Sequence, residues 1–222
     1  MKRYLYKLIS SFLRSKRLYL VKSLVYDDNE RKILRTDIDL VRVSTAELCA
    51  REIESKKLKG SIAEVGVYKG DFASVLNGLF PSKTLYLFDT FTGFDSKDTQ
   101  FEKAENLSKS TQDFSNTSTE LVLSKMEFPE RCVVKKGFFP TTTDGINDTF
   151  CFVSLDADLY QPIYAGLVYF YERLEKGGYI FIDDYNNSYY KGSKEAVRQF
   201  CTEMGITPVP IPDSCGGVII TK

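Results

Sequence analysis

The 222-residue sequence contains no histidine. This absence excludes a Ser-His-Asp triad, a histidine general base and histidine ligands to a metal ion. Proton transfer by this chain must therefore use carboxylates, lysine, tyrosine or cysteine. The net charge is also zero, because 30 basic residues balance 30 acidic ones. No nucleic-acid partner is expected, since proteins that bind duplexes usually carry a surplus of basic residues.

Cysteine pairs and long apolar runs are missing as well. The five cysteines are scattered and form no CxxC pair, so neither a zinc site nor a disulfide framework is expected, and reduced thiols in a cytoplasmic protein fit better. No apolar stretch reaches the roughly 20 residues that a transmembrane helix needs. A signal peptide is not expected either, because Arg14, Lys16 and Arg17 interrupt the first apolar segment.

Residues 1–35 are predicted to form a basic helical extension. The first 22 residues contain seven lysines and arginines and no acid, and their apolar residues recur with helical spacing. Such a helix packs on the domain or on a partner subunit, or it makes loose contact with an anionic membrane surface. The sequence leaves these alternatives open, and with them a homo-oligomer.

From residue 36 to 222, apolar runs typical of strands alternate with helical patterns. One strand begins at Ser61 and runs into a glycine turn, and others are predicted at 84–91, 131–137, 149–158 and 179–185. Two short strands follow in the tail after residue 206. This order predicts an α/β domain with a doubly wound, mostly parallel, Rossmann-like sheet and an antiparallel strand near the C-terminus.

Helices are predicted between these strands, at 71–80, 119–126, 161–178 and 193–205. An earlier helix is expected to begin near Ser44 or Thr45 and to end at Gly60, and Gly177 with Gly178 is interpreted as a helix stop. Residues 94–118 are long and polar for a connection. Such a segment is either a lid over a ligand site or a plain solvent loop.

Acidic residues gather at the predicted strand ends. "VSLDADLYQP" places Asp156 and Asp158 after one apolar run, and "YIFIDDYNN" places Asp183 and Asp184 after the next. Ligands of open α/β sheets bind beyond the carboxyl ends of the strands. Carboxylates so close together repel one another unless a cation lies between them. The alternative for Asp158 or Asp184 is a helix N-cap.

The first glycine turn, "EVGVYKG", is a GxxxG pattern and not the GxGxxG dinucleotide fingerprint. A nicotinamide dinucleotide is therefore disfavoured. Asp89, at the end of the second strand, is placed to accept hydrogen bonds from the ribose hydroxyls of an adenosine. With Glu64 at the end of the first strand, the acids suit a cationic nucleoside such as the sulfonium of S-adenosylmethionine. By itself, this pattern is also common in ordinary α/β packing.

Taken together, these segments resemble the macrocin O-methyltransferase family. The blocks that carry the resemblance are "AEVGVYKGDFASVLNGLFPSKTLYLFDTFTGFD", "FVSLDADLYQPIYAGLVYFYERLEKGGYIFIDDYN" and "KGSKEAVRQF", within residues 63–200. The resemblance implies a class I methyltransferase fold, S-adenosylmethionine as methyl donor and a divalent metal, usually Mg²⁺. The implied acceptor is a hydroxyl of a sugar, a glycosylated natural product or a polysaccharide precursor.

The resemblance also implies roles for single residues. Asp156, Asp183 and Asp184 would bind the metal ion, and Asp158 would be the general base. One departure is Ile182–Asp183, where the family often has a histidine-containing strand end, but the acidic pair is intact. The residues implied around the cofactor are Glu64, Gly66, Val67, Tyr68, Gly70, Asp89, Thr90 and Asp156.

This set of residues predicts how an unreactive alcohol is activated. A hard cation stabilises the developing alkoxide, a carboxylate takes the proton, and oxygen ligands favour Mg²⁺. The tyrosines near the second acidic pair and at Tyr160 either line the acceptor pocket or pack elsewhere (Tyr160, Tyr185, Tyr189, Tyr190). Two other functions remain open, namely a glycosyltransferase with a metal-binding DxD at "DAD" and a non-catalytic subunit that binds the cofactor.

Overall fold

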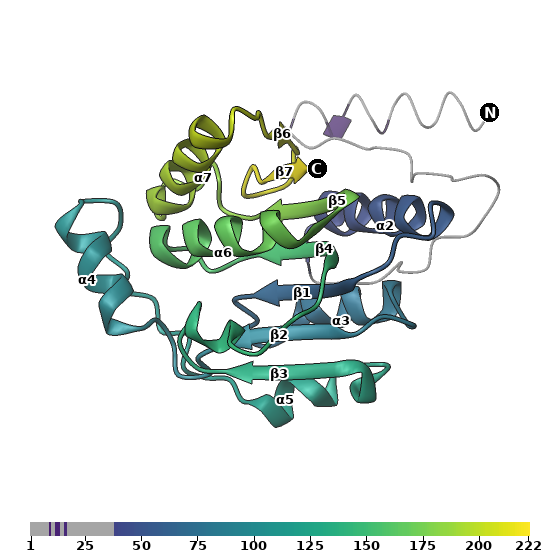
Figure 1. Ribbon diagram of the computed structural model, residues 1–222. Helices are drawn as coiled ribbons and strands as arrows, with labels where there is room; N and C mark the ends of the chain where they lie inside the picture. The colour runs from purple at the N-terminus through teal and green to yellow at the C-terminus, as the bar shows by residue number, and fades with distance from the viewer. Residues whose placement is uncertain (1–8, 10–11, 14–15, 17–37) are drawn as a thin grey trace. The chain divides into compact units, whose positions relative to one another are not determined.

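Figure 1 shows the computed structural model, which describes residues 38–222 together with Ile9, Phe12, Leu13 and Lys16. The chain divides into two compact units, residues 1–32 and 33–222, and each is described by itself. In the first unit, Ile9, Phe12 and Leu13 are helical. The rest of the predicted basic helix, and the predicted boundary after residue 35, lie outside the described residues.

The core of the second unit is a seven-stranded sheet with the order β3-β2-β1-β4-β5-β7-β6. The strands from β3 to β5 pair in parallel, and β7 is antiparallel to both β5 and β6. The predicted doubly wound, mostly parallel sheet with an antiparallel C-terminal strand is therefore confirmed. The bounds are β1 Ser61–Val65, β2 Leu85–Asp89, β3 Cys132–Lys136, β4 Phe150–Leu155, β5 Leu174–Ile182, β6 Val209–Pro210 and β7 Val218–Thr221.

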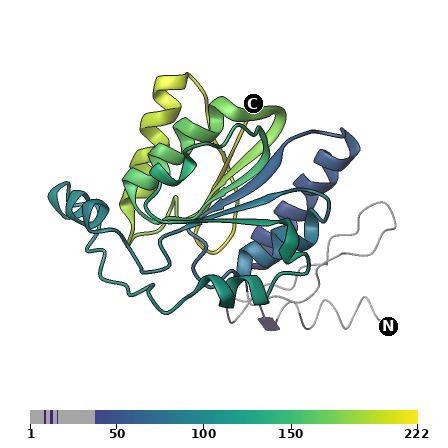
Figure 2. The ribbon, with the colours of Figure 1, turned by 60° about the horizontal axis from the view of Figure 1, so that its bottom comes forward.

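Helices cover both faces of this sheet, with α2 and α3 on one side and α6 and α7 on the other (Figure 2). Alternate residues of a strand point to opposite faces. Thus Leu85 and Leu87 belong to the hydrophobic cluster under α2 and α3, whereas Phe88 belongs to the cluster under α6 and α7. The bounds are α2 Leu40–Ser55, α3 Asp71–Leu79, α4 Ser96–Ala104, α5 Thr119–Ser124, α6 Tyr160–Arg173 and α7 Lys191–Met204, with 3₁₀ turns at Pro129–Arg131 and Thr141–Thr143.

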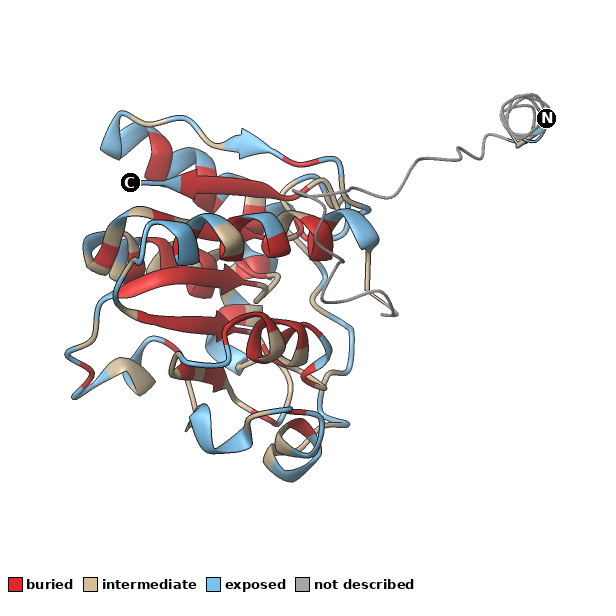
Figure 3. Cartoon of the chain, turned by 90° about the vertical axis from the view of Figure 1, so that its right-hand side faces the viewer, coloured by how far each residue is buried: buried red, intermediate tan, exposed pale blue. Residues whose placement is uncertain are grey.

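Burial on both faces explains why the central strands were predictable from apolar runs. Every residue of β1 and of β4 is buried, and Figure 3 shows the central strands as a buried layer between helices whose outer sides are exposed. Among the described residues, no helix combines the length and the hydropathy needed to cross a bilayer.

Helix α2 begins before the predicted position near Ser44 or Thr45, so that prediction was wrong. The N-cap is Asp39, whose Oδ1 accepts hydrogen bonds from the backbone N–H groups of Val41, at 2.7 Å, and Arg42, at 3.2 Å. The hydroxyls of Ser44 and Thr45 instead bond back to the carbonyls four residues earlier, at 2.6 and 2.7 Å, as such residues do inside helices.

The interpretation of Gly177 and Gly178 as a helix stop was also wrong. Helix α6 ends at Arg173, and both glycines lie inside β5. A Cβ on Gly178 would lie 2.9 Å from the carbonyl oxygen of Cys151 in β4. The glycine is therefore needed where the backbones of two neighbouring strands approach closely.

Candidate cofactor and carboxylate site

The carboxyl ends of β1, β2 and β4 open onto a pocket of about 310 Å³. Its wall is formed by the glycine turn after β1, by the residues after β2, and by the segment that follows β4. Of the residues predicted around a cofactor, Gly70 is the one that does not line it. The structure therefore brings seven of the predicted cofactor residues to one pocket, together with Asp158. The seven are Glu64, Gly66, Val67, Tyr68, Asp89, Thr90 and Asp156.

The glycine turn is held against the end of β4. Gly66 has a φ of +83°, and a Cβ at this position would lie 2.0 Å from the carbonyl oxygen of Asp156. Its backbone N–H donates to the carbonyl of Phe88 at 2.9 Å. Only glycine fits this combination of a left-handed φ and a close backbone approach. Gly70 plays a different part, as the N-cap residue of α3.

Asp89 holds the same turn from the end of β2. Its Oδ2 accepts hydrogen bonds from the backbone N–H groups of Val67 and Tyr68, both at 2.8 Å, and its Oδ1 accepts one from Phe91 at 2.6 Å. An ionised carboxylate has about four acceptor positions. Three of these are occupied by the protein's own backbone, so Asp89 shapes the turn besides facing the pocket.

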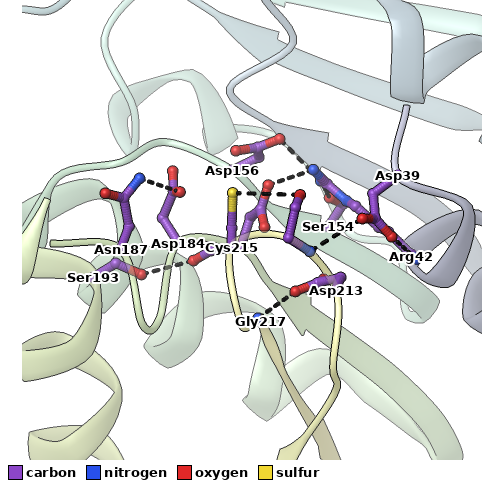
Figure 4. A network of polar contacts seen from close by, with 12 residues as sticks. Asp39, Arg42, Ser154, Asp156, Asp184, Asn187, Ser193, Asp213, Cys215 and Gly217 are labelled. Carbon is purple, nitrogen blue, oxygen red and sulfur yellow. Dashed lines mark hydrogen bonds and ion pairs between the residues drawn. The ribbon is translucent and has the colours of Figure 1, made fainter. Parts of the chain in front are cut away.

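Arg42 lies beside the carboxylates at the tips of β4 and β5, and the sequence analysis did not include it. Its Nη2 donates to Asp156 Oδ2 at 2.9 Å and its Nη1 to Asp183 Oδ2, as Figure 4 shows for Asp156. Nη2 also lies 3.3 Å from the hydroxyl of Ser154. The guanidinium packs 4.0 Å over the ring of Phe72. No local pattern could reveal this residue, because its acidic partners are more than 110 positions away.

Asp184 is buried and the other three aspartates of the two pairs are half-buried, so their negative charges lie close together and largely away from water. Burial and the charge of Asp156 raise the pKa of Asp183 to about 7, although Arg42 opposes this rise. The pKa of Asp158 is well above its ordinary value because of burial and a hydrogen bond with Asp184. Burial and the charge of Asp156 also raise the pKa of Glu64, whose Oε2 has no hydrogen-bond partner. One guanidinium therefore does not neutralise this cluster.

Neither Asp158 nor Asp184 caps a helix. The N-cap residue of α6 is Leu159 and that of α7 is Tyr190, so the helix-cap interpretation of these aspartates was wrong. Both have left-handed backbone conformations, with φ values of 60° and 56°. Such strain in a non-glycine residue persists only where the surrounding structure enforces it, commonly at ligand sites. Asp184 Oδ1 accepts a hydrogen bond from Asn187 at 2.7 Å.

The donor set fits a hard divalent cation. Ligand atoms of Asp183, Asp184 and Cys215 lie within 4.8 Å of one another, and Asp156 is not part of this group. Burial, Asp183 and Asp184 raise the pKa of the Cys215 thiol to about 12. A protonated thiol is a poor ligand for a hard cation, so the aspartate oxygens are the suitable donors. Cys215 was not predicted.

Residues 94–118 cover the pocket with aromatic side chains. Phe94 and Phe114 line it, and the ring of Phe114 lies 5.1 Å from those of both Phe94 and Tyr68. The segment also contains α4, which the sequence analysis missed. Glu102 of α4 is buried and accepts a hydrogen bond from the backbone N–H of Tyr160 at 2.7 Å. The segment is thus attached to the domain through Tyr68 and through the first residue of α6.

The four predicted tyrosines do not line this pocket, which is the one assigned to the cofactor, and their place in an acceptor pocket stays a prediction. The ring of Tyr160 stacks on Tyr164 at 5.9 Å, and Tyr189 is 80% exposed. Tyr190 is buried with its ring 6.0 Å from Phe94, and Lys194 lies 5.1 Å over the ring of Tyr185.

Asp98 of α4 makes the stability of the protein depend on pH. It lines the pocket, is 6% exposed, and its Oδ1 has no hydrogen-bond partner. Burial, followed by the charges of Asp95 and Glu102, raises its pKa from 3.8 to about 7. Between these two values the folded state holds a proton that the unfolded chain releases. This carboxyl therefore destabilises the fold increasingly as the pH rises through that window.

We expect Asp98→Asn to remove this penalty. The unfolding free energy of the variant relative to the original protein should rise by at most about 1.4 kcal/mol per pH unit from pH 5 to pH 7 and then level off. Urea unfolding at several pH values measures it. Asp113→Asn is the control, because its side-chain hydrogen bond with Ser115 lowers the pKa of Asp113. A flat difference for Asp98→Asn contradicts the assignment.

Comparison with known proteins identifies the family. The sequence model of the family described as macrocin O-methyltransferase (TylF) matches residues 27–215. A curated relative is demethyldecarbamoylnovobiocin O-methyltransferase of Streptomyces niveus, 22% identical over 166 residues, which are 68% of this chain and 62% of the relative. The match thus spans under two thirds of that relative's length.

Solved structures share the fold. The O-methyltransferase NovP has a TM-score of 0.67 and 20% identity, over 82% of this chain and 80% of NovP. The calicheamicin methyltransferase CalS11 has a TM-score of 0.66 and 19% identity, over 82% of this chain and 79% of CalS11. The match to the family model spans the glycine turn, the strand tips and the helices described above, and the chain therefore belongs to the macrocin O-methyltransferase family.

Proposed function

We propose that the protein is an S-adenosylmethionine-dependent O-methyltransferase that acts on a hydroxyl of a sugar, a glycosylated natural product or a polysaccharide precursor. The observation that carries this proposal is the adjacency of a nucleoside-sized pocket and two aspartate pairs, half-buried or buried, at the tips of neighbouring strands. Family membership supports it. So does a related structure described as a TDP-rhamnose 3′-O-methyltransferase.

The pocket has suitable chemistry for the methyl donor. Glu64 supplies a buried carboxylate with one unpartnered oxygen, which favours the positive charge of a sulfonium or of an amino group. Asp89 and Thr90 line the pocket, where they would face a ribose, and Phe138 and Phe139 offer apolar rings for an adenine. Residues 94–118 serve as the lid that keeps water from the sulfonium.

The reaction is an in-line displacement in which an oxygen–carbon bond forms as the carbon–sulfur bond breaks. The hydroxyl proton moves to the carboxylate of Asp158, which lines the pocket beside Asp156. Asp156, Asp183 and Asp184 would hold the divalent cation, which would stabilise the developing alkoxide. Orientation of donor and acceptor by the pocket supplies the rest of the rate enhancement.

The remaining partners follow from composition. A zero net charge and this pocket suit a small or glycan acceptor with free hydroxyls rather than a nucleic acid. All five cysteines are free thiols, which suits a cytoplasmic location. Contact of residues 1–35 with a membrane surface or a second subunit remains a prediction. A glycosyltransferase or a non-catalytic subunit is not favoured by the family match.

Binding of S-adenosylhomocysteine to the purified chain tests this function. We expect isothermal titration to detect stoichiometric binding, since the demethylated donor keeps the adenosine and amino acid groups. Methyl transfer to a panel of sugar and glycan acceptors should stop with EDTA and return with excess Mg²⁺, whereas binding of S-adenosylhomocysteine should survive chelation. Absence of that binding contradicts the proposed cofactor. Activity that persists in EDTA contradicts only the metal.

A further inference from the structure

Arg42 makes a two-pronged contact with the tips of two neighbouring strands. One planar guanidinium donates through Nη2 to Asp156 at the end of β4 and through Nη1 to Asp183 at the end of β5. The arginine side chain is 10% exposed, and those of Asp156 and Asp183 are 25% and 11% exposed. The ring of Phe72, 4.0 Å away, supports the guanidinium from one side. Arginine suits such a fork, whereas lysine offers a single point of charge.

The contact engages one oxygen of each aspartate and leaves the other outside the fork. Arg42 takes Oδ2 of both Asp156 and Asp183, so the guanidinium does not hold Oδ1 of either side chain. Without the guanidinium, these two carboxylates would repel each other and turn apart. Asp158 and Asp184 form a second pair, in contact with each other, which the guanidinium does not reach.

Helix α2 is itself tied to the same corner of the domain. Asp39, its N-cap, uses Oδ1 for the helix and Oδ2 to accept a hydrogen bond from the backbone N–H of Ser214 at 3.1 Å. Ser214 precedes Cys215, whose sulfur lies beside Asp183 and Asp184. The start of α2 is therefore attached to the aspartate cluster twice. One attachment is the loop that carries Ser214 and Cys215, and the other is Arg42 in the first turn of the helix.

We propose that Arg42 is a positioning residue for the cation site. It holds Oδ2 of Asp183 so that the other carboxylate oxygen is left for a divalent cation beside Asp184, and it fixes Asp156 at the neighbouring strand tip, so that α2 becomes part of the site. This inference rests on the proposed function, which supplies the cation. Groups that hydrogen-bond to metal ligands orient them, and their removal typically weakens metal binding about 10–100-fold.

A competing role for Arg42 has the opposite consequence. If the Arg42 guanidinium occupied the place of the cation, it would repel an incoming metal ion. Removal of the guanidinium would then tighten metal binding. The sign of the change in affinity therefore separates a positioning arginine from a competing one. Loss of fold alone would weaken binding of S-adenosylhomocysteine as well, so the two ligands must be measured together.

The experiment measures Mn²⁺ and S-adenosylhomocysteine binding to the full chain by isothermal titration, with electron paramagnetic resonance as a second readout of bound Mn²⁺. The variants are Arg42→Met, Arg42→Lys and the control Arg198→Met, whose side chain is 57% exposed on α7. We expect Arg42→Met to bind Mn²⁺ about 10–100-fold more weakly, a larger loss than that of S-adenosylhomocysteine binding, since Arg42 also lines the wall of the pocket. Arg42→Lys keeps the positive charge but not the two parallel N–H donors, and its Mn²⁺ binding should also be weaker. This variant replaces Arg42→Met in the test if the methionine variant does not fold.

Three results would overturn the inference that Arg42 positions the ligands of the cation. Equal or tighter Mn²⁺ binding by either Arg42 variant overturns the inference and leaves the proposed function in place. If the original protein binds S-adenosylhomocysteine but no Mn²⁺, the metal part of the proposed function fails, and the inference fails with it. Weaker Mn²⁺ binding that Arg198→Met reproduces also overturns it, because the effect would then reflect net charge.

Discussion

Replacement of Asp158 by asparagine is expected to lower kcat by about 10²–10⁴-fold, the range that a positioned general base contributes. The asparagine amide would keep the shape of the side chain but could not accept the hydroxyl proton. Asp158 lines the pocket next to Asp156 and is in contact with Asp184. Because its role is proton transfer, S-adenosylhomocysteine should bind the variant about as tightly as the original protein.

Single-turnover methyl transfer and isothermal titration measure these two quantities. Asp144→Asn is a suitable control, because Asp144 is an exposed acid after the second 3₁₀ turn, and it should change neither. If Asp158→Asn keeps its turnover, another group accepts the proton. If it loses donor binding and turnover together, Asp158 acts on the cofactor and not on the acceptor.

Substitution of Gly66 by alanine is expected to cause the second large loss. The new Cβ would lie 2.0 Å from the carbonyl oxygen of Asp156, at a φ of +83°. The turn or the end of β4 must then move, and Asp89 would lose its hydrogen bonds to the turn. We expect the unfolding free energy to fall by about 2–4 kcal/mol and S-adenosylhomocysteine binding to be abolished.

Gly145 supplies a matched control for Gly66. Its φ is +77°, but a Cβ there would meet nothing within 4 Å. Gly145→Ala therefore carries the backbone strain without the collision, and it should cost about 1 kcal/mol with normal donor binding. Urea unfolding and titration of both variants separate strain from collision. Equal effects of the two substitutions would show that close approach to Asp156 is unimportant.

The strands and the acidic strand tips could be predicted because their signals are local. Apolar runs buried on both faces mark β1, β4 and β5, and the acids that follow them fall at one edge of a parallel sheet by topology alone. The start of α2 was missed because Asp39 competes with Ser44 and Thr45 as a possible cap. Helix α4 was missed because its residues are mostly polar and its anchor, Glu102, bonds to a distant backbone group.

Arg42 illustrates what a single sequence does not reveal. An arginine in the first turn of a helix is ordinarily exposed, and nothing near it in the chain indicates a buried position. Its burial depends on Asp156 and Asp183, which reach it only through the folded sheet. The same holds for Cys215, which the loop before β7 brings to the aspartates. Contacts between residues far apart in the sequence therefore complete a site that local sequence patterns predict only in part.

The two margins of the sheet bear on how copies of this chain could assemble. Strand β6 has only two residues, the second of which is Pro210 and cannot donate a ladder hydrogen bond. Strand β3 at the opposite margin ends in Lys135 and Lys136, charges that discourage pairing with another strand. Neither margin offers a template for a continuous intermolecular sheet. Strand pairing between copies at these two margins is therefore disfavoured.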